Sequence, residues 1–239
     1  CIRDRFYGKV VGWSITAFEG GHEPYDMWTT AERPIGGVLQ LPSEVEAQGV
    51  PSHWLAYIST PDLDATVALA KELGGTMHHE EAVPTVGRFA FLQDPWGAPF
   101  CAFTPEEMPE EVGRPSPGEF SWHELMADDH EKAFAFYSDL FGWEKGAAMD
   151  LGEAGIYQLF RRPGQEMDDG GMMTRPPEVQ VSSWLYYVNI ADLDDAVAAV
   201  KAEGGQVLHG PMEVPGGDRI CVCMDPQGGV FALHEFGPA

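Results

Sequence analysis

An internal repeat constrains the fold of this chain more than any other feature of its sequence. Residues 94–103 (DPWGAPFCAF) match residues 225–234 (DPQGGVFALH) at an offset of 131 positions. Residues 6–13 match residues 136–143 at an offset of 130, and both segments begin with Phe-Tyr and end with Gly-Trp. Three shorter segments also match at an offset of 130: residues 52–57 with 182–187, 62–64 with 192–194, and 74–75 with 204–205. This many matches at one spacing predict two homologous domains in tandem.

Within each domain, the residue pattern predicts a strand, a helix and three more strands. Residues 192–203 carry apolar residues at helical spacing, between an N-capping aspartate and a Gly-Gly stop signal. A strand is expected before this helix, at residues 184–189, and shorter strands after it, with the Asp-Pro turn leading into the last one. The first domain repeats this order, with a strand at residues 54–59 and a helix at residues 62–73.

The front half of the second domain shows the same module again. It has a predicted strand at residues 120–126, a helix at 131–140, and strands near residues 143–148, 156–160 and 170–174. We therefore predict an α+β fold of two tandem domains, each a pair of βαβββ modules that form a curled, cup-shaped mixed sheet. The expected domains are residues 1–107 and 116–239, with a linker at residues 108–115.

The first domain starts one strand late. Cys1 aligns with Glu131, so the strand predicted at residues 120–126 has no counterpart in the first domain. A sheet that lacks this strand exposes an edge, which favours pairing with another chain. A homo-oligomer formed through that edge is therefore one expected arrangement.

The charge balance narrows the choice of partners. The chain has 14 Lys and Arg against 38 Asp and Glu, a formal net charge of −24 at pH 7. Nucleic acid and anionic membranes would be repelled, and no apolar run is long enough to span a bilayer. The charge serves either solubility or the attraction of a cationic small molecule.

The cysteines indicate a reducing compartment. Four cysteines in 239 residues do not suggest a disulfide framework. Cys221 and Cys223 are two apart in a predicted strand, so both point to one face and are expected in the core. We expect a cytoplasmic protein.

Two motifs carry a resemblance to a known superfamily. Paired modules in which Phe-Tyr is followed by Gly-Trp, and Asp-Pro-x-Gly precedes the last strand, resemble the vicinal oxygen chelate superfamily. That group includes glyoxalase I, extradiol dioxygenases, fosfomycin resistance enzymes and bleomycin resistance proteins. The tandem form is most similar to a glyoxalase-like, hydroxylase-labelled subgroup. The resemblance covers nearly the whole chain and implies a ligand-holding cup, but it says little about the reaction, because one scaffold hosts several chemistries.

In metal-dependent members, the resemblance implies His, Glu or Gln on the first and last strands of the modules. The last-strand position lies seven residues after the Asp of Asp-Pro-x-Gly, where this chain has Ala232 and Cys101. The first-strand position of the second domain is Trp122. The remaining positions hold no carboxylate or imidazole; they are Trp184 or Leu185, Trp54 or Leu55, and one of residues 170–173. We therefore expect no metal and no other cofactor.

Two polar residues lie next to these positions. Glu124 follows Trp122 by two residues and His234 follows Ala232 by two, so each shares a strand face with its neighbour. The two side chains could form an acid–base pair in the cup, make ordinary hydrogen bonds at a strand end, or belong to a displaced metal site. The doublet His78-His79 follows a Gly-Gly stop, and we expect it in a surface loop.

Other candidate ligand-binding residues have competing interpretations. Arg88 and Arg219 occupy equivalent positions at the start of a strand, and each either pairs with a nearby carboxylate or reaches the cup to bind an anionic oxygen. Five aromatic residues are expected either in the core or in the lining of the cups; they are Trp54, Tyr57, Trp122, Trp184 and Tyr187.

Two main hypotheses for function follow. One is a metal-independent enzyme that acts on a small organic molecule, as a lyase, isomerase or hydroxylase, with Glu124 and His234 as catalytic residues. The other is a binding protein that sequesters a cationic or aromatic small molecule, as bleomycin resistance proteins do. A scaffold or regulator with vestigial pockets is a third.

Overall fold

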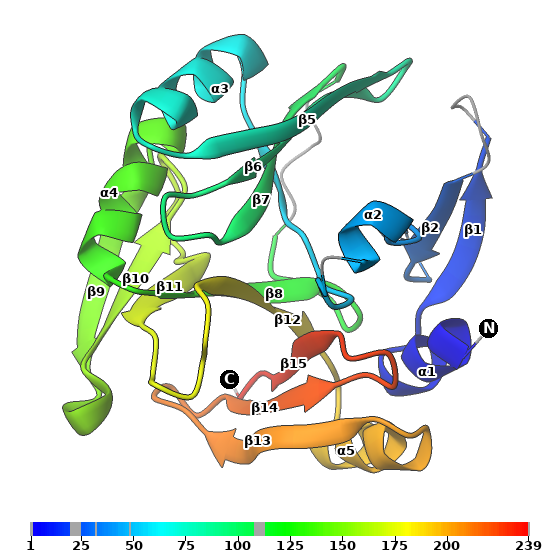
Figure 1. Ribbon diagram of the computed structural model, residues 1–239. Coiled ribbons are helices and arrows are strands. Elements are labelled where there is room, and N and C mark those ends of the chain that lie inside the picture. The colour runs from blue at the N-terminus through cyan, green and yellow to red at the C-terminus, as the bar shows by residue number, and fades with distance from the viewer. Residues whose placement is uncertain (1, 20–24, 32, 48, 108–112, 239) are drawn as a thin grey trace. The chain divides into compact units, whose positions relative to one another are not determined.

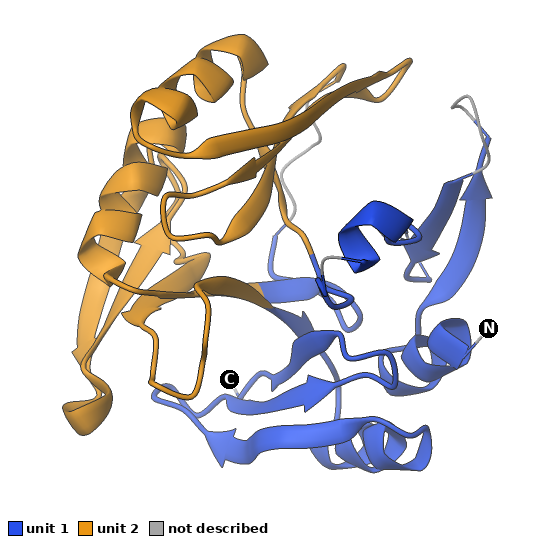
Figure 2. Cartoon of the chain, viewed as in Figure 1, with its two compact units in different colours: residues 1–54, 112–121, 186–239 blue, residues 55–111, 122–185 orange. Residues whose placement is uncertain are grey.

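The computed structural model describes residues 2–19, 25–31, 33–47, 49–107 and 113–238 (Figure 1). The chain divides into two compact units (Figure 2). Unit 1 comprises Cys1–Trp54, Val112–Ser121 and Tyr186–Ala239, and unit 2 comprises Leu55–Glu111 and Trp122–Leu185. Among the described residues, no helix is both long and apolar enough to cross a membrane.

Unit 2 is built from two successive modules of the sequence. The first contains β4 (Tyr57–Ser59), α3 (Leu63–Glu72), β5 (Thr76–Val83), β6 (Gly87–Gln93) and β7 (Pro99–Pro105). The second contains β8 (Phe120–Ala127), α4 (His130–Phe141), β9 (Glu144–Asp150), the 3-10 turn η1 (Gly152–Ala154), β10 (Ile156–Arg161) and β11 (Gly170–Thr174). The first two residues of β8, Phe120 and Ser121, belong to unit 1. The strands run in the orders β4-β7-β6-β5 and β8-β11-β10-β9. In each module the first strand pairs parallel with the last, β4 with β7 and β8 with β11.

Unit 1 is built from the first and last modules. The first contains α1 (Ile2–Val10), β1 (Ser14–Phe18), β2 (Tyr25–Thr29) and β3 (Pro34–Val38), followed by the short α2 (Ser43–Glu46). The last contains β12 (Ser183–Asn189), α5 (Leu193–Ala202), β13 (Gln206–Glu213), β14 (Arg219–Met224) and β15 (Val230–Glu235). The strands run in the orders β1-β2-β3 and β13-β14-β15-β12, and β12 pairs parallel with β15. Strand β3 pairs antiparallel with β2.

Each unit has one hydrophobic core, to which both of its modules contribute. In unit 2, α3 and α4 share a cluster with the sheet residues Leu92, Phe100 and Leu125. In unit 1, α1 and α5 share a cluster with Cys221, Cys223 and Leu233. The odd-numbered residues of β15 and the even-numbered residues of β7 point to these cores, because strand side chains alternate between the two sheet faces.

The repeated motifs hold the two modules of a unit together. Tyr7 of the first Phe-Tyr motif donates a 2.7 Å hydrogen bond to Asp225 Oδ2 of the second Asp-Pro-x-Gly motif. Tyr137 of the second Phe-Tyr motif donates a 3.2 Å hydrogen bond to Asp94 Oδ2 of the first Asp-Pro-x-Gly motif. Each tyrosine also stacks on the Trp of its own Gly-Trp pair, at centroid distances of 5.4 and 5.5 Å. Each compact unit therefore combines one module from each sequence repeat, whereas the predicted domain ranges follow the repeats themselves.

Local sequence signals explain the helix ends. Asp62, Asp129 and Asp192 cap the N-termini of α3, α4 and α5, and each carboxylate accepts hydrogen bonds from backbone N–H groups of the first turn. Gly142 ends α4 in the left-handed conformation, with φ of 70°. The predicted helices and most predicted strands occur within a few residues of their expected ranges. His78 and His79 differ, because they lie in β5 and not in a surface loop.

Candidate functional site

The positions where the superfamily resemblance places metal ligands do not carry a fitting donor set. Ala232 is a fully buried methyl group in β15. Cys101 is fully buried in β7, and burial raises the pKa of its thiol to about 12, so it stays protonated at neutral pH. The indole N–H of Trp122 donates a 2.8 Å hydrogen bond to the hydroxyl of Tyr157. Among the described residues, no group of three or more His, Cys, Asp or Glu side chains could hold a metal ion.

Glu124 of β8 belongs to a hydrogen-bonded chain in unit 2. Leu125 and Ala127 point to the core, so Trp122 and Glu124 lie on the opposite face of the strand. The Tyr157 hydroxyl donates a 3.0 Å hydrogen bond to Glu124 Oε2. Burial and the charge of Glu124 raise the pKa of Tyr157 well above its usual value, so this hydroxyl remains a donor. Glu124 is thus a carboxylate held in a fixed orientation.

The neighbouring sheet of unit 2 carries an aromatic face, consisting of Tyr57, Phe89, Phe91 and Phe103. The Phe89 and Phe103 rings are parallel, with centroids 4.6 Å apart. Tyr57 meets the rings of Phe89, Phe91 and Phe103 edge-on, at 5.5, 6.3 and 6.3 Å. Tyr57 is 42% exposed, although it lies in a strand of a packed sheet.

His234 of β15 belongs to a second chain, in unit 1. Its Nδ1 lies 2.8 Å from Ser121 Oγ, and its Nε2 lies 3.0 Å from Asp218 Oδ2. The backbone N–H of Gly237 donates a 2.7 Å hydrogen bond to the other oxygen of Asp218. His234 is 5% exposed and contacts the Phe236 ring at a centroid distance of 4.5 Å.

The surroundings of Asp218 keep its carboxyl ionised. Partial burial by itself would raise the pKa of Asp218, but the hydrogen bonds from Gly237 and His234 and the nearby charges of His234 and Arg114 outweigh burial and lower this pKa. The Arg114 guanidinium lies 4.0 Å from the centroid of the Phe236 ring.

The predicted catalytic residues therefore have different partners. Glu124 is placed with Trp122 and Tyr157 in unit 2, and His234 is placed with Ser121 and Asp218 in unit 1. Sequence reasoning did not identify Ser121, Asp218 or Tyr157. Their roles depend on contacts between segments far apart in the chain, and no local motif marks them.

Two of the predicted aromatic ligand-binding residues pack on the cores, and a third is buried on the other face of its strand. Trp54 packs on the unit 1 cluster and meets Tyr7 edge-on at 5.3 Å. Trp184 packs on the unit 2 cluster and donates a 3.0 Å hydrogen bond to the Tyr137 hydroxyl. Tyr187 is buried in β12, but its neighbour Val188 packs in the unit 1 core, so Tyr187 lies on the opposite face of the strand. The contacts of Trp54 and Trp184 favour the core interpretation, and of the five predicted aromatic residues Tyr57 is the most exposed.

The equivalent arginines pair with carboxylates of the helices. Arg88 contacts Asp64 of α3 and Glu80 of β5. Arg219 contacts Asp194 of α5 and Glu235 of β15. Both sets of contacts favour the interpretation that these arginines tie a helix to its sheet, and an anion-binding role stays a prediction.

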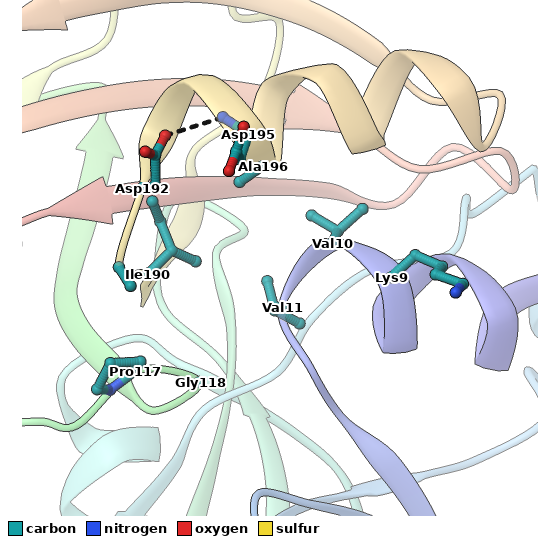
Figure 3. Close-up of a pocket in the computed structure, with 10 residues that line it drawn as sticks. Lys9, Val10, Val11, Pro117, Gly118, Ile190, Asp192, Asp195 and Ala196 are labelled. Atoms are coloured by element: carbon teal, nitrogen blue, oxygen red, sulfur yellow. Dashed lines mark hydrogen bonds between the residues drawn. The ribbon is translucent and has the colours of Figure 1, made fainter.

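A surface pocket of about 270 Å³ lies between α1 and α5 in unit 1 (Figure 3). The apolar side chains of Val10, Val11 and Ile190 line the pocket, and Lys9 lies at the edge of the lining residues (Figure 3). The carboxylate of Asp192 accepts a 2.9 Å hydrogen bond from Asp195 N–H and so serves as the helix cap. None of the predicted site residues lines this pocket.

Comparison with known proteins identifies the family. The model described as "Glyoxalase/Bleomycin resistance protein/Dioxygenase superfamily" matches residues 120–233, and the model described as "Glyoxalase-like domain" matches residues 4–103. A glyoxylase-like domain-containing protein of Didymella fabae is 36% identical over 92 residues, which cover 38% of this chain and 72% of that protein. The protein CFP32 of Mycobacterium tuberculosis is 28% identical over 237 residues, which cover 98% of this chain and 89% of that protein.

Solved structures share the fold. A Mn(II)-bound glyoxalase from Novosphingobium aromaticivorans superposes with a TM-score of 0.61 at 14% identity, covering 99% of this chain and 78% of that one. Homoprotocatechuate 2,3-dioxygenase from Arthrobacter globiformis gives a TM-score of 0.64 at 16% identity, covering 98% and 76%. The predicted fold class, α+β with two glyoxalase-type domains in tandem, is confirmed. The chain belongs to the glyoxalase/bleomycin resistance protein/dioxygenase superfamily.

Proposed function

We propose that this chain binds a small, planar aromatic molecule with cationic character on the aromatic face of unit 2, and that Glu124 acts on it as an acid–base group without a divalent metal. The observation that carries the proposal is the exposed Tyr57 ring, set edge-on among Phe89, Phe91 and Phe103.

The fold does not require these rings. At the equivalent positions of the second repeat, 130 or 131 residues later, Phe89, Phe91 and Phe103 are replaced by Ile220, Val222 and His234. The strands β14 and β15 form the same antiparallel pair as β6 and β7 without them. Exposing aromatic surface loses hydrophobic stabilisation, and such surface on one module supports a binding role.

Nearby charge supports a cationic ligand. Glu81 pairs directly opposite Phe89, and His79 opposite Phe91, so both flank the rings on the same sheet face. Aromatic faces and carboxylates both attract cations, and the formal charge of −24 adds to this attraction. A relative in Streptomyces peucetius, named anthracycline biosynthesis protein DnrV, is 29% identical over 140 residues, which cover 51% of this chain and 48% of that protein. Anthracyclines combine a planar aromatic system with an amino sugar.

Glu124 supports chemistry in addition to binding. Its carboxylate is oriented by the Tyr157 hydroxyl, which is itself oriented by Trp122. Gly171 leaves room for this arrangement, because a Cβ there would collide with the Tyr157 ring. The four rings and Glu124 all lie on strand faces that point away from the unit 2 core, and the proposal places the ligand within reach of both. A fixed carboxylate at that distance can remove or deliver a proton. The metal-independent part of the proposal is supported by Ala232, Cys101 and Trp122 at the positions of the family's ligands.

The test is binding of daunorubicin and of its neutral aglycone, followed by ligand fluorescence and by thermal shift. We expect tighter binding of the cationic compound, and a loss of about fivefold or more in affinity for Tyr57→Ala and Phe103→Ala, since each ring contact with the ligand is worth about 1 kcal/mol. Leu208→Ala, which removes an exposed apolar side chain from β13, is the matched control. Unchanged affinity in both ring variants would refute the binding site.

A second measurement separates an enzyme from a sequestering protein. The bound compound is incubated with wild-type protein and with Glu124→Gln, and the products are analysed by mass spectrometry. If the wild-type protein converts the compound, and Glu124→Gln binds it with unchanged affinity but does not convert it, the protein is an enzyme. Binding without any conversion favours sequestration, for which the aromatic face and the negative charge are sufficient.

A further inference from the structure

The hydrogen-bonded chain around His234 indicates which atom donates and which accepts in each contact. The Asp218 carboxylate is ionised, so it can only accept a hydrogen bond, and His234 Nε2 therefore carries the proton. In the neutral imidazole this leaves Nδ1 with a lone pair, which accepts the proton of the Ser121 hydroxyl. A hydroxyl, a base and an orienting carboxylate are thus joined in the order that activated serines use. The two ring nitrogens are exchanged relative to serine proteases, and either nitrogen can act as the base.

The three groups differ in access to solvent. His234 is 5% exposed, so its hydrogen bonds are shielded from competing water. Ser121 is half-buried at the start of β8 and retains an accessible surface. Asp218 is fixed on its far side by Gly237 N–H at 2.7 Å. A shielded base next to a half-buried hydroxyl meets one requirement for nucleophilic attack on a small molecule.

The strand pairing of this module can form without these hydrogen-bonded side chains. The repeat equivalents of His234 and Asp218 are Phe103 and Gly87, and β6 and β7 form the same kind of antiparallel pair without them. A structural alternative for Ser121 is its 3.4 Å contact with the carbonyl of Tyr187, which is longer and weaker than the 2.8 Å contact with His234.

We propose that Ser121, His234 and Asp218 form a nucleophilic site in unit 1 that cleaves carboxylic esters of small molecules, separate from the ligand site proposed for unit 2. Ser121 Oγ bonds to the ester carbonyl carbon while its proton passes to His234 Nδ1. The ester C–O bond then breaks, and the departing alcohol takes that proton. Water next bonds to the acyl carbon, gives a proton to His234, and the acyl–oxygen bond to Ser121 breaks as the hydroxyl recovers its proton. No oxidant or reductant is required.

The test uses the full chain with two probes, diisopropyl fluorophosphate and p-nitrophenyl acetate. We expect a single phosphoryl adduct, mapped to Ser121 by peptide mass spectrometry, and a burst of p-nitrophenol in proportion to the protein. His234→Ala should slow both reactions on the order of 10³-fold, and Asp218→Asn should also slow them strongly, since a misoriented imidazole is a poor base. His53→Ala, at an exposed histidine bonded to the Pro51 carbonyl, is the matched control.

A merely structural role gives different results. If neither probe reacts at Ser121, or if labelling of Ser121 is unchanged in a folded His234→Ala protein, the proposal is wrong. The variant Ser121→Cys provides an independent measurement in case the other variants do not fold. Its thiol should react with iodoacetamide at pH 6 much faster than free cysteine, and addition of His234→Ala should remove that advantage. A thiol in Ser121→Cys that reacts no faster than free cysteine would also overturn the proposal.

Discussion

Asp218 makes the stability of unit 1 sensitive to acid. Its carboxyl has a lower pKa in the folded protein than in the unfolded chain, because hydrogen bonds and nearby positive charge outweigh burial. Such a group adds stability at pH values above the unfolded pKa of about 3.9, and this contribution is lost as pH falls through the folded pKa.

We therefore expect Asp218→Asn to unfold at lower urea concentration than wild type near pH 7, with the difference shrinking below about pH 4. Urea titrations across this range measure it. Asp139→Asn, at a surface position of α4, is the control. A difference that grows toward acid pH would contradict the assignment.

At the residue scale, single positions were predictable from the sequence but their partners were not. His234 was identifiable because the repeat aligns it two residues beyond Ala232, on the same strand face. Ser121 and Asp218 were not, because one opens a strand and the other ends a Gly-rich turn, and neither lies in a motif of known chemistry. The pairing of β15 with β14 brings the segments of His234 and Asp218 together. The segment of Ser121 joins them through β12, which pairs with β15 and whose Asn189 N–H bonds to the Glu119 carbonyl.

At the scale of elements, the hydrogen bonds that join a motif of one repeat to a motif of the other are directly testable. Tyr7 bonds to Asp225, which lies 218 positions away, and not to the chemically identical Asp94 of its own repeat. Tyr7 is 2% exposed and the bond is partly buried, so loss of either partner should destabilise the protein by about 1–3 kcal/mol. Residues in contact show coupling, whereas distant residues do not.

A double-mutant cycle of Tyr7→Phe with Asp225→Asn should give a coupling energy of about 0.5–3 kcal/mol by urea unfolding. The matched cycle of Tyr7→Phe with Asp94→Asn should be additive within about 0.5 kcal/mol, because Asp94 bonds to Tyr137. Coupling in the second cycle and additivity in the first would show that the modules pair within a repeat.

The contacts between motifs of different repeats are also the part of the fold that could not be predicted from the sequence. Helices and strands were predictable because Asp62 and Asp192 cap periodic apolar segments. The pairing of modules was not, since Tyr7 and Tyr137 are equivalent, as are Asp94 and Asp225, and both pairings satisfy the same chemistry. Three strands were predicted after α3, but β5 was not located and its His78-His79 pair was expected in a loop. At the edge of its sheet β5 has mostly exposed, polar residues, which hide the alternation of a strand.

At the scale of the whole molecule, repulsion between like charges opposes folding. A formal net charge of −24 at pH 7 destabilises a compact state by self-repulsion, and salt screens it. We expect the melting temperature to rise by a few degrees when NaCl is increased from about 20 to about 200 mM near pH 7. Near the isoelectric point of about 4.4 the same change in salt should have little effect. An equal response at both pH values would point to a general salt effect and not to repulsion.

The order of the modules also determines when each unit can form during synthesis. Unit 2 is complete once the segment ending at Leu185 has left the ribosome, whereas the segment Cys1–Trp54 of unit 1 must wait for Tyr186–Ala239. Its buried residues Phe6, Tyr7 and Trp28 stay uncovered during that time. Contacts between such distant segments form slowly, and at high concentration the waiting segment can take its partner from a neighbouring chain. The yield of correctly folded unit 1 should therefore fall as the protein concentration during refolding rises. The placing of unit 2 between the two main segments of unit 1 thus makes folding of unit 1 slow and prone to pairing between chains.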